Sequence, residues 1–507
     1  MPHGAGKTCC VLGVVALGIS AAWSALAADN AKKPAAASRP AKAAQAAPQS
    51  AQSKYFGVAA CARCHIRPTP EDVDSGVTDF VLLTEYDTWS TKDKHSQAYE
   101  RMVASERTKS MERLLKIDAK TEASCLACHA IHATASASEA SFKVERGVSC
   151  EACHGASSQW VDRHWKPGWR TLSSDEKTGL GMFDVRDPVR RTQLCLSCHL
   201  GDVQQGKIVT HEMYAAGHPP LPGFELETFA KAMPAHWRHV WDKPLAIQKQ
   251  LGYEPESMPQ TKLVLGSSLV ALRQAVSLLG DQAALEERPW PELALYDCQA
   301  CHHDLRSPSW RQRRGFAGQP GRPSLHAWPL ALAQLCISTT GSAEQRLSGL
   351  LKPLTVALDQ QAFGSRAAVA RAAAEVAGQL DKTIGQVASK PLTSADARAL
   401  LSRICQQAAA APVDYESARQ LAWAWRMIYT ELSERPKNDE QISAVVEGLA
   451  AQLALDLVGG RNTSDTVIDG KSPAVANRYD PAVFQAQMGK LRSLLEPSVP
   501  SGKKKSE

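Results

Sequence analysis

The chain contains five copies of the pattern Cys-x-x-Cys-His. The types and spacing of these residues suit a chemical role. Two thiols separated by two residues lie over one edge of a single helical turn, where they can add to the two vinyl groups of one porphyrin. The His that follows can then bind the iron from the proximal side. The copies span Cys61–His65, Cys125–His129, Cys150–His154, Cys195–His199 and Cys298–His302.

The motifs predict five covalently bound haem c groups, each carrying one iron. The attachment thiols would be Cys61, Cys64, Cys125, Cys128, Cys150, Cys153, Cys195, Cys198, Cys298 and Cys301. The proximal iron ligands would be His65, His129, His154, His199 and His302. Zinc is the alternative for paired thiols, because structural zinc is also bound by Cys and His. A zinc site does not need a His directly after every second Cys, so the motifs favour haem.

The second axial ligand of each iron decides what each haem can do. A distal His gives a six-coordinate electron carrier of low potential, a Met raises the potential, and an open position can bind a substrate. The histidines outside the N-terminal leader and the motifs outnumber the haems and all precede residue 327, which favours mostly bis-His coordination. We expect the distal ligands to come from His95, His164, His211, His218, His236 and His239. His132, His303 and His326 are weaker candidates.

The motifs are unevenly spaced along residues 55–310. The interval is 25 residues between His129 and His154 but 103 residues between His199 and His302. A tandem repeat would be regular, so we expect one intertwined pentahaem domain with short helices at each motif and long loops between them. The shortest interval implies that the haems on His129 and His154 lie close together.

The chain changes character after the last motif. Residues 311–325 are rich in Gly, Pro and Arg and are expected to form a linker. Residues 326–496 contain no haem motif, and their apolar residues recur at helical spacing. We expect an α-helical domain of four or five helices here. The predicted fold class is therefore mostly α with extensive loops: a multihaem cytochrome c domain followed by an α-helical bundle.

Individual helices can be placed within this outline. Apolar residues indicate helices over 269–279 and 369–387. Thr393 with Asp396 resembles a capping pair, and Asp414 could cap the next helix. That helix carries Trp423 and Trp425, which we expect in the core.

The two ends of the chain differ from the rest. Residues 1–28 have the pattern of a secretory signal peptide, with a cleavage site at Ala25-Leu26-Ala27. Residues 29–54 are expected to be a disordered Ala/Pro/Lys linker, and residues 497–507 a disordered tail. Export would place the protein in the periplasm. If the segment stayed uncleaved, it would be about long enough to anchor the chain in a membrane.

The net charge bears on the class of partner, and the cysteines outside the motifs bear on the redox compartment. The formal net charge of +6 is mild, so nothing indicates nucleic acid, and we expect redox proteins of the periplasm as partners. Cys336 and Cys405 belong to neither the leader nor a motif. They would form either a disulfide in an oxidising compartment or two buried free thiols.

Three segments of the chain resemble the cytochrome c-554 family, within the wider group of multihaem cytochromes that includes hydroxylamine oxidoreductase. These segments are Trp89 with Lys94-His95-Ser-Gln-Ala98, Cys125–His129, and Gly147-Val-Ser-Cys150-Glu-Ala-Cys153-His154-Gly155. The resemblance covers about residues 55–220. It implies stacked haem pairs, distal ligands at His95 and His164, and one haem without a protein distal ligand, by analogy the haem on His129. The fifth motif and the helical region depart from the four-haem pattern of the family.

Two functions follow from these expectations. The first is a periplasmic electron-transfer cytochrome with mostly bis-His haems, in which the motif ending at His302 is the point where electrons enter or leave. The second is an oxidoreductase that acts on a small nitrogen or sulfur compound at one open haem. Pentahaem nitrite reductases mark their catalytic haem with Cys-x-x-Cys-Lys, and no such motif occurs in this chain. Electron transfer is therefore favoured over catalysis.

Overall fold

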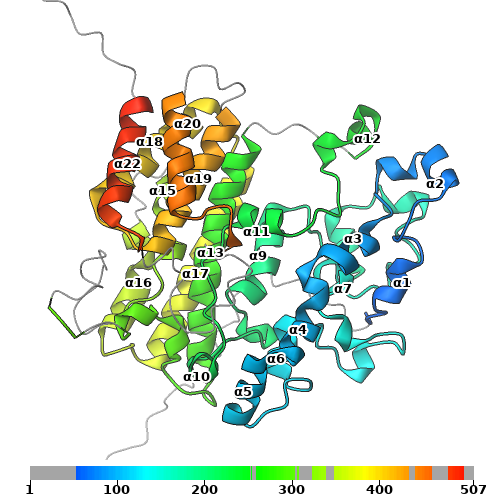
Figure 1. Cartoon of the computed structure of the whole chain (residues 1–507), viewed down its shortest axis with the longest axis horizontal. Coiled ribbons are helices and arrows are strands. Elements are labelled where there is room, and N and C mark those ends of the chain that lie inside the picture. The colour runs from blue at the N-terminus through cyan, green and yellow to red at the C-terminus, as the bar shows by residue number, and fades with distance from the viewer. Residues whose placement is uncertain are drawn as a thin grey trace, which may run out of the picture. The chain divides into compact units, whose positions relative to one another are not determined.

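The computed structural model describes residues 53–251, 253, 258–302, 305–307, 323–338, 347–432, 440–458 and 478–495. The predicted signal peptide 1–28, most of the linker 29–54, most of the linker 311–325 and the tail 497–507 lie outside these residues. Residues 43–507 form one compact unit. Its described part is mostly helical, with isolated bridges in place of β-strands, which confirms the predicted fold class (Figure 1).

Short helices mark the motifs, as predicted. The first motif begins on α1 (Val58–Ala62), the next three lie on α6 (Ala123–His129), α7 (Cys150–His154) and α9 (Pro188–His199), and the fifth begins on the 3-10 turn Cys298–Ala300. Further short helices separate them. These are α2 (Pro70–Asp74), α3 (Glu85–Lys92), α4 (Ala98–Ala104), α5 (Glu106–Leu115), α8 (Ser174–Gly179), α10 (His211–Ala216), α11 (Leu226–Ala232) and α12 (Leu245–Gln250).

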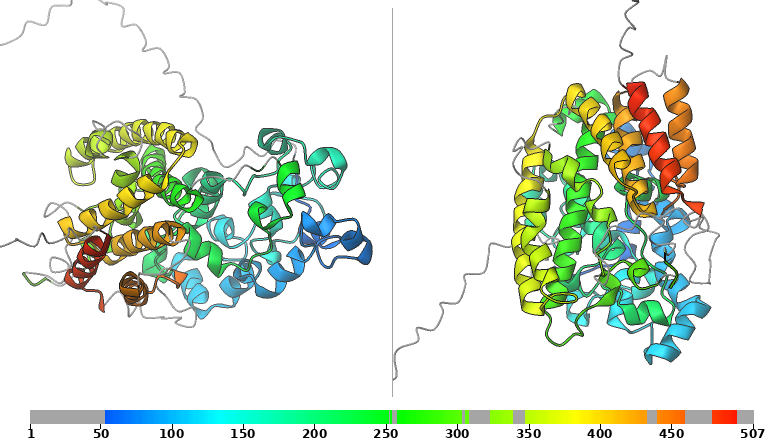
Figure 2. Two further views of the ribbon diagram at one scale, coloured as in Figure 1. Left: turned by 90° about the horizontal axis from the view of Figure 1, so that it is seen from above. Right: turned by 90° about the vertical axis from the view of Figure 1, so that its left-hand side faces the viewer.

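The long helix α13 (Pro259–Ala284) is the centre of the hydrophobic core. It packs against α9 on one side and against α17 (Arg366–Ser389) and α19 (Tyr415–Leu432) on others. Helices α13 and α17 run side by side in all the views (Figures 1 and 2). A Cβ added at Gly280 would lie 2.6 Å from Cβ of Ala373, so glycine permits this close approach. Helix α13 is long and apolar enough to cross a membrane, but most of it is buried inside the protein, as in the core helix of a soluble protein.

The remaining helices follow the fifth motif. Among the described residues they are α15 (Ala333–Ser338), α16 (Leu347–Asp359), α17, α18 (Ser394–Ala410), α19, α20 (Glu440–Gln452) and α22 (Pro481–Leu495), more than the four or five expected. The capping box of Thr393 and Asp396 is present at the start of α18, and Asp414 accepts a hydrogen bond from the Ser417 amide. Trp423 and Trp425 are buried, as predicted.

One hydrophobic core contains residues from both sides of the expected linker at 311–325. The same buried cluster contains Leu196 of α9 and Leu226 of α11 together with Leu380, Trp423 and Leu491. The division of the chain into two domains stays a prediction. Cys336 and Cys405 are buried and are not joined by a disulfide, and the Cys336 thiol donates a hydrogen bond to the Leu265 carbonyl at 3.4 Å.

A buried ion pair joins the haem-motif region to the C-terminal helices. Glu225 and Arg419 are almost completely buried, and both nitrogen–oxygen distances of their fork are 3.1 Å. The guanidinium also donates to the carbonyls of Leu453, Ala454 and Leu457. A buried charge is tolerated only when its partners satisfy it, so this pair holds the segment before α11 against α19.

Replacing Arg419 by Met should lower the free energy of unfolding by about 3–5 kcal/mol, because Glu225 would be left as an uncompensated buried charge. Denaturant unfolding followed by circular dichroism measures this loss. Arg426 is a matched control on the same helix, since its partner Asp456 is largely exposed. Arg426→Met should cost about 1 kcal/mol or less. Equal losses in the two variants would contradict the assigned role of Arg419.

Candidate haem-binding site

Four pairs of histidines from distant segments face one another. The ring centres are 6.0 Å apart for His65 and His164 and 6.3 Å apart for His95 and His199. They are 6.5 Å apart for His129 and His218 and 6.4 Å apart for His211 and His302. Each pair joins one histidine of a Cys-x-x-Cys-His motif to one of the predicted distal ligands.

The spacing within these pairs is the spacing that one shared metal ion requires. An imidazole nitrogen lies about 2.0–2.1 Å from a first-row metal ion, and the ring centre lies about 1.1 Å behind it. Two histidines on opposite faces of one iron therefore have ring centres about 6.2–6.4 Å apart. Direct stacking would bring the rings closer than this, so the four pairs have room for one iron each.

The position of His95 is fixed by the segment that precedes the third motif. The backbone carbonyl of His95 accepts a hydrogen bond from the Val148 amide at 3.0 Å. The Trp89 indole donates to the Val148 carbonyl at 3.1 Å. A Cβ at Gly147 would lie 2.8 Å from the His95 carbonyl oxygen, and its φ of 65° also favours glycine. The family-like residues Trp89, Gly147 and Val148 thus position His95, one of the predicted axial ligands.

Glu151, between the two cysteines of the third motif, ties that motif to the first. Its carboxylate is buried and accepts hydrogen bonds from the amides of Phe56 and Gly57, just before α1. It also accepts from the amide and hydroxyl of Ser157. One carboxylate therefore satisfies four donors and fixes α7 next to α1.

The attachment cysteines of different motifs approach one another in a definite order. The neighbouring Cys150 lowers the pKa of the Cys61 thiol, and the neighbouring Cys198 raises the pKa of the Cys128 thiol. Cys153 interacts electrostatically with Cys195 and Cys198. These interactions relate the first motif to the third and the second to the fourth. The close approach of the haems on His129 and His154, expected from the short interval between them, stays a prediction.

One large cavity is lined by the first four motifs. Its volume is about 3470 Å³, several times the 300–1,000 Å³ of an ordinary small-ligand pocket. His95, His164, His218, His236 and His239 also line it. The fifth motif does not, and Cys298, Cys301 and His302 are exposed.

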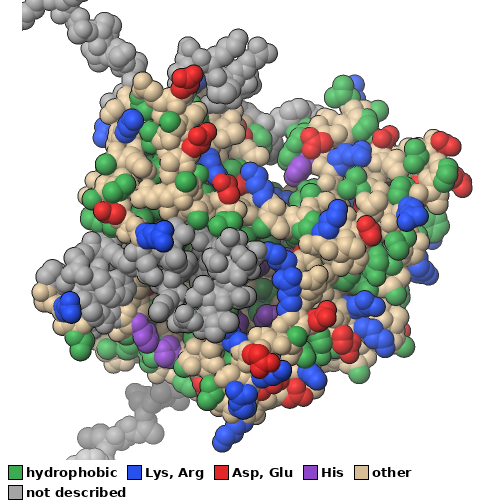
Figure 3. Space-filling model, viewed as in Figure 1, with side chains coloured by type: hydrophobic (Ala, Val, Ile, Leu, Met, Phe, Trp, Pro, Cys, Tyr) green, Lys and Arg blue, Asp and Glu red, His purple; other side chains and the backbone are tan. Residues whose placement is uncertain are grey.

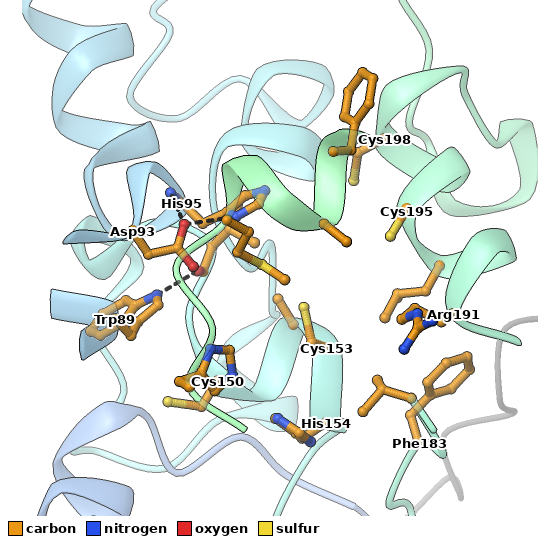
Figure 4. Close-up of a pocket in the computed structure, with 18 of the residues that line it drawn as sticks. Trp89, Asp93, His95, Cys150, Cys153, His154, Phe183, Arg191, Cys195 and Cys198 are labelled. Carbon is orange, nitrogen blue, oxygen red and sulfur yellow. Dashed lines mark hydrogen bonds and ion pairs between the residues drawn. The ribbon is translucent and has the colours of Figure 1, made fainter. Parts of the chain in front are cut away.

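The lining of this cavity fits haem. Arg191, one helical turn before Cys195 on α9, points into the cavity between Cys195 and Phe183 (Figure 4). Its Nε atom is buried and has no hydrogen-bond partner among the described residues. A buried guanidinium needs a negative counterpart, and the propionates of haem would supply one.

The electrostatics of the cavity keep several imidazoles neutral. Burial lowers the pKa of His154, His199 and His218 to about 4 in each case. These histidines are therefore uncharged near pH 7, the state in which imidazole binds a metal ion.

His218 lies at the spacing of a shared iron from His129, which does not favour the expected open haem on His129; the open position stays a prediction. His154 is different: no described aromatic or histidine ring lies at a comparable distance. A remaining candidate is His236, which interacts electrostatically with His154 and whose Nδ1 lies 3.4 Å from the Pro234 carbonyl. His239 lines the cavity but makes no ring pair with a motif histidine; its side chain is exposed and stacks on Trp241, with ring centres 4.3 Å apart.

The zinc alternative gains no support from the arrangement of side chains. In the part of the chain that the structure describes, no group of three or more His, Cys, Asp or Glu side chains is placed to hold a metal ion. Structural zinc sites need four such ligands.

The comparison with known protein families agrees with this geometry. Residues 60–155 match the family described as cytochrome c554 and c-prime. The chain is a multihaem c-type cytochrome. The match covers the first three motifs, His95 and the residues that position it, and it supports covalent attachment of haem c. No curated protein and no solved structure matches the chain.

Sequence reasoning missed several residues of the cytochrome that act through others. Glu85 and Asp93 are hydrogen-bonded to His65 and His95, Glu151 joins two motifs, and Arg191 enters the cavity. Asp93 and Glu151 could have been noticed, because one lies two residues before a predicted ligand and the other lies inside a motif. Glu85 and Arg191 gave no signal, since isolated charged residues on short helices are usually solvent exposed.

Replacing His218 by Ala should convert one low-spin haem of the cytochrome to a high-spin haem, because one iron would lose its second axial ligand. Electron paramagnetic resonance of the ferric protein measures this change. His132→Ala is the matched control, since His132 is exposed and makes no pair with a motif histidine. If His218→Ala leaves the low-spin signals intact, His218 is not an axial ligand.

Proposed function

We propose that this cytochrome is a periplasmic pentahaem electron carrier in which most irons have two histidine ligands. The observation that carries the proposal is the set of four histidine pairs with ring centres 6.0–6.5 Å apart. When bound, haem supplies reversible one-electron chemistry, and two protein ligands leave an iron no free position for a substrate.

The residues of the chain support transfer along a series of sites. Electrostatic interactions between attachment cysteines relate the first motif to the third, the third to the fourth, and the fourth to the second. His218, paired with the second motif, follows α10 closely in the sequence, and His211 at the start of α10 is paired with the fifth. The order supported is therefore first, third, fourth, second, fifth, with the exposed fifth motif at one end.

The face of the molecule in view in Figure 3 is compatible with docking of redox proteins. Figure 3 shows Lys and Arg interspersed with Asp and Glu over the face in view, without a single field of one charge. We propose export to the periplasm, where redox proteins would be the donor and the acceptor.

The number of haems and their spin states test this proposal. Mass spectrometry of the exported protein should find five attached haems, each adding about 616 Da. Nitrite or hydroxylamine should leave the low-spin resonance signals unchanged. Fewer haems, or a haem that binds either compound, would contradict a five-haem carrier.

A second candidate function, catalysis at the haem on His154, is favoured by the missing partner ring at that motif. His236→Ala separates the two functions, with the exposed His239→Ala as control. If the protein is an electron carrier, His236→Ala should create a high-spin haem that is absent from the wild type, and His239→Ala should not. An oxidoreductase predicts a high-spin haem already in the wild type, which the substitution leaves unchanged.

A further inference from the structure

Two of the paired histidines are hydrogen-bonded to carboxylates through the ring nitrogen Nδ1. Glu85 Oε2 lies 3.0 Å from Nδ1 of His65, and Asp93 Oδ1 lies 3.0 Å from Nδ1 of His95. In both rings this leaves Nε2 as the metal ligand. A metal-bound His commonly donates its other N–H to such an outer partner, which raises the basicity of the ligand.

Both carboxylates are fixed by a second hydrogen bond. Asp93 is only 3% exposed, and Oδ1 also accepts the backbone N–H of His95 at 3.0 Å; Figure 4 shows the carboxylate directed at His95. Glu85 is the first residue of α3, and its other oxygen accepts the Leu82 amide at 2.8 Å. Neither contact is therefore a chance meeting of mobile surface side chains.

Other axial histidines have weaker, uncharged acceptors. Nδ1 of His164 lies 2.6 Å from the Val161 carbonyl, and Nδ1 of His218 lies 2.8 Å from the Pro219 carbonyl. His129 interacts with the backbone of Ala98. A neutral carbonyl increases the electron donation of an imidazole less than a carboxylate does.

The two carboxylates serve two different pairs of motifs. Of the first and third motifs, whose Cys61 and Cys150 influence each other, Glu85 binds His65 of the first. Of the second and fourth motifs, whose Cys128 and Cys198 influence each other, Asp93 binds His95, the partner of His199 in the fourth. Among the described residues, no carboxylate is hydrogen-bonded to the ring of His154, His129 or His218. Each pair is thus chemically asymmetric.

We infer that Glu85 and Asp93 are positioning residues that lower the reduction potentials of the haems on Cys61–His65 and Cys195–His199 below those of their neighbours. The neighbours are the haems on Cys150–His154 and Cys125–His129, respectively. A more basic imidazole stabilises ferric iron over ferrous iron, so it lowers the potential. Within each pair, electrons then run from the carboxylate-bearing member to the other. This inference rests on the proposed function, because it assigns His65 and His95 as axial ligands.

Asp93→Asn in the full haem-loaded protein is the sharpest test. The side-chain oxygen of Asn can still accept both hydrogen bonds from His95, so only the negative charge is lost. In a spectroelectrochemical titration, one component should move to higher potential. Glu85→Gln should raise a different component, and the double variant should show both shifts, because the two carboxylates serve different haems.

Asp87→Asn is the matched control, since Asp87 is exposed on the same helix as Glu85 and its removal deletes the same charge. The control variant should leave the reduction potential of every haem component unchanged within the error of the titration. The inference is overturned if Asp93→Asn shifts no component, shifts one downward, or shifts all components as the control does. If Glu85→Gln loses haem, the Asp93→Asn result decides alone, because that change preserves the hydrogen bonds.

His95→Ala distinguishes failure of the inference from failure of the proposed function. Loss of a true axial ligand creates a high-spin signal in the ferric protein. If that signal is absent, the pairing of His95 with His199 is wrong, and the proposed function loses one of its pairs. If the signal is present and Asp93→Asn shifts no component, only the tuning by carboxylates is wrong.

Discussion

Two imidazoles that share one iron must meet at a fixed separation from opposite sides, and the region before residue 303 is folded to satisfy this constraint. The motif histidines lie on short helices or directly after them. Their partners lie in turns and at helix ends far along the chain. His95 pairs with His199, and His129 with His218. Such meetings require the loops to cross, which explains why the motifs form one intertwined unit rather than a row of separate haem modules.

The meeting points are fixed by polar contacts as much as by hydrophobic packing. Large parts of this region face a cavity of about 3470 Å³ instead of other side chains, so fewer apolar contacts hold its loops. Glu151 satisfies four donors at once and joins two motifs, and the Val148 amide fixes the backbone of His95. These contacts tolerate little change, because a buried carboxylate or amide left without its partner costs free energy.

The C-terminal helices supply the hydrophobic core against which this loop-rich region packs. Helix α13 packs on α9, which carries the fourth motif, and also on α17 and α19. The buried pair of Glu225 and Arg419 reinforces the same contact. The rigid apolar helices thus support one side of the haem cavity, and the fifth motif is left exposed beyond it, where electrons can be exchanged.

The sequence by itself determined the covalent chemistry and the helical character, and it supplied the candidates for the distal ligands. A Cys-x-x-Cys-His motif acts within one turn of chain, and amphipathic helices are recognised from nearby residues, so both could be predicted for α6, α7, α13 and α17. The sequence offered His95, His164, His211 and His218 as candidates, but not the motif histidine that each one faces. Only the tertiary structure shows which rings face one another and that Glu85 and Asp93 are hydrogen-bonded to His65 and His95. These depend on contacts between segments far apart in the chain, whose approach is set by the folding of long loops and by the shared core, and intervals along the sequence do not record it.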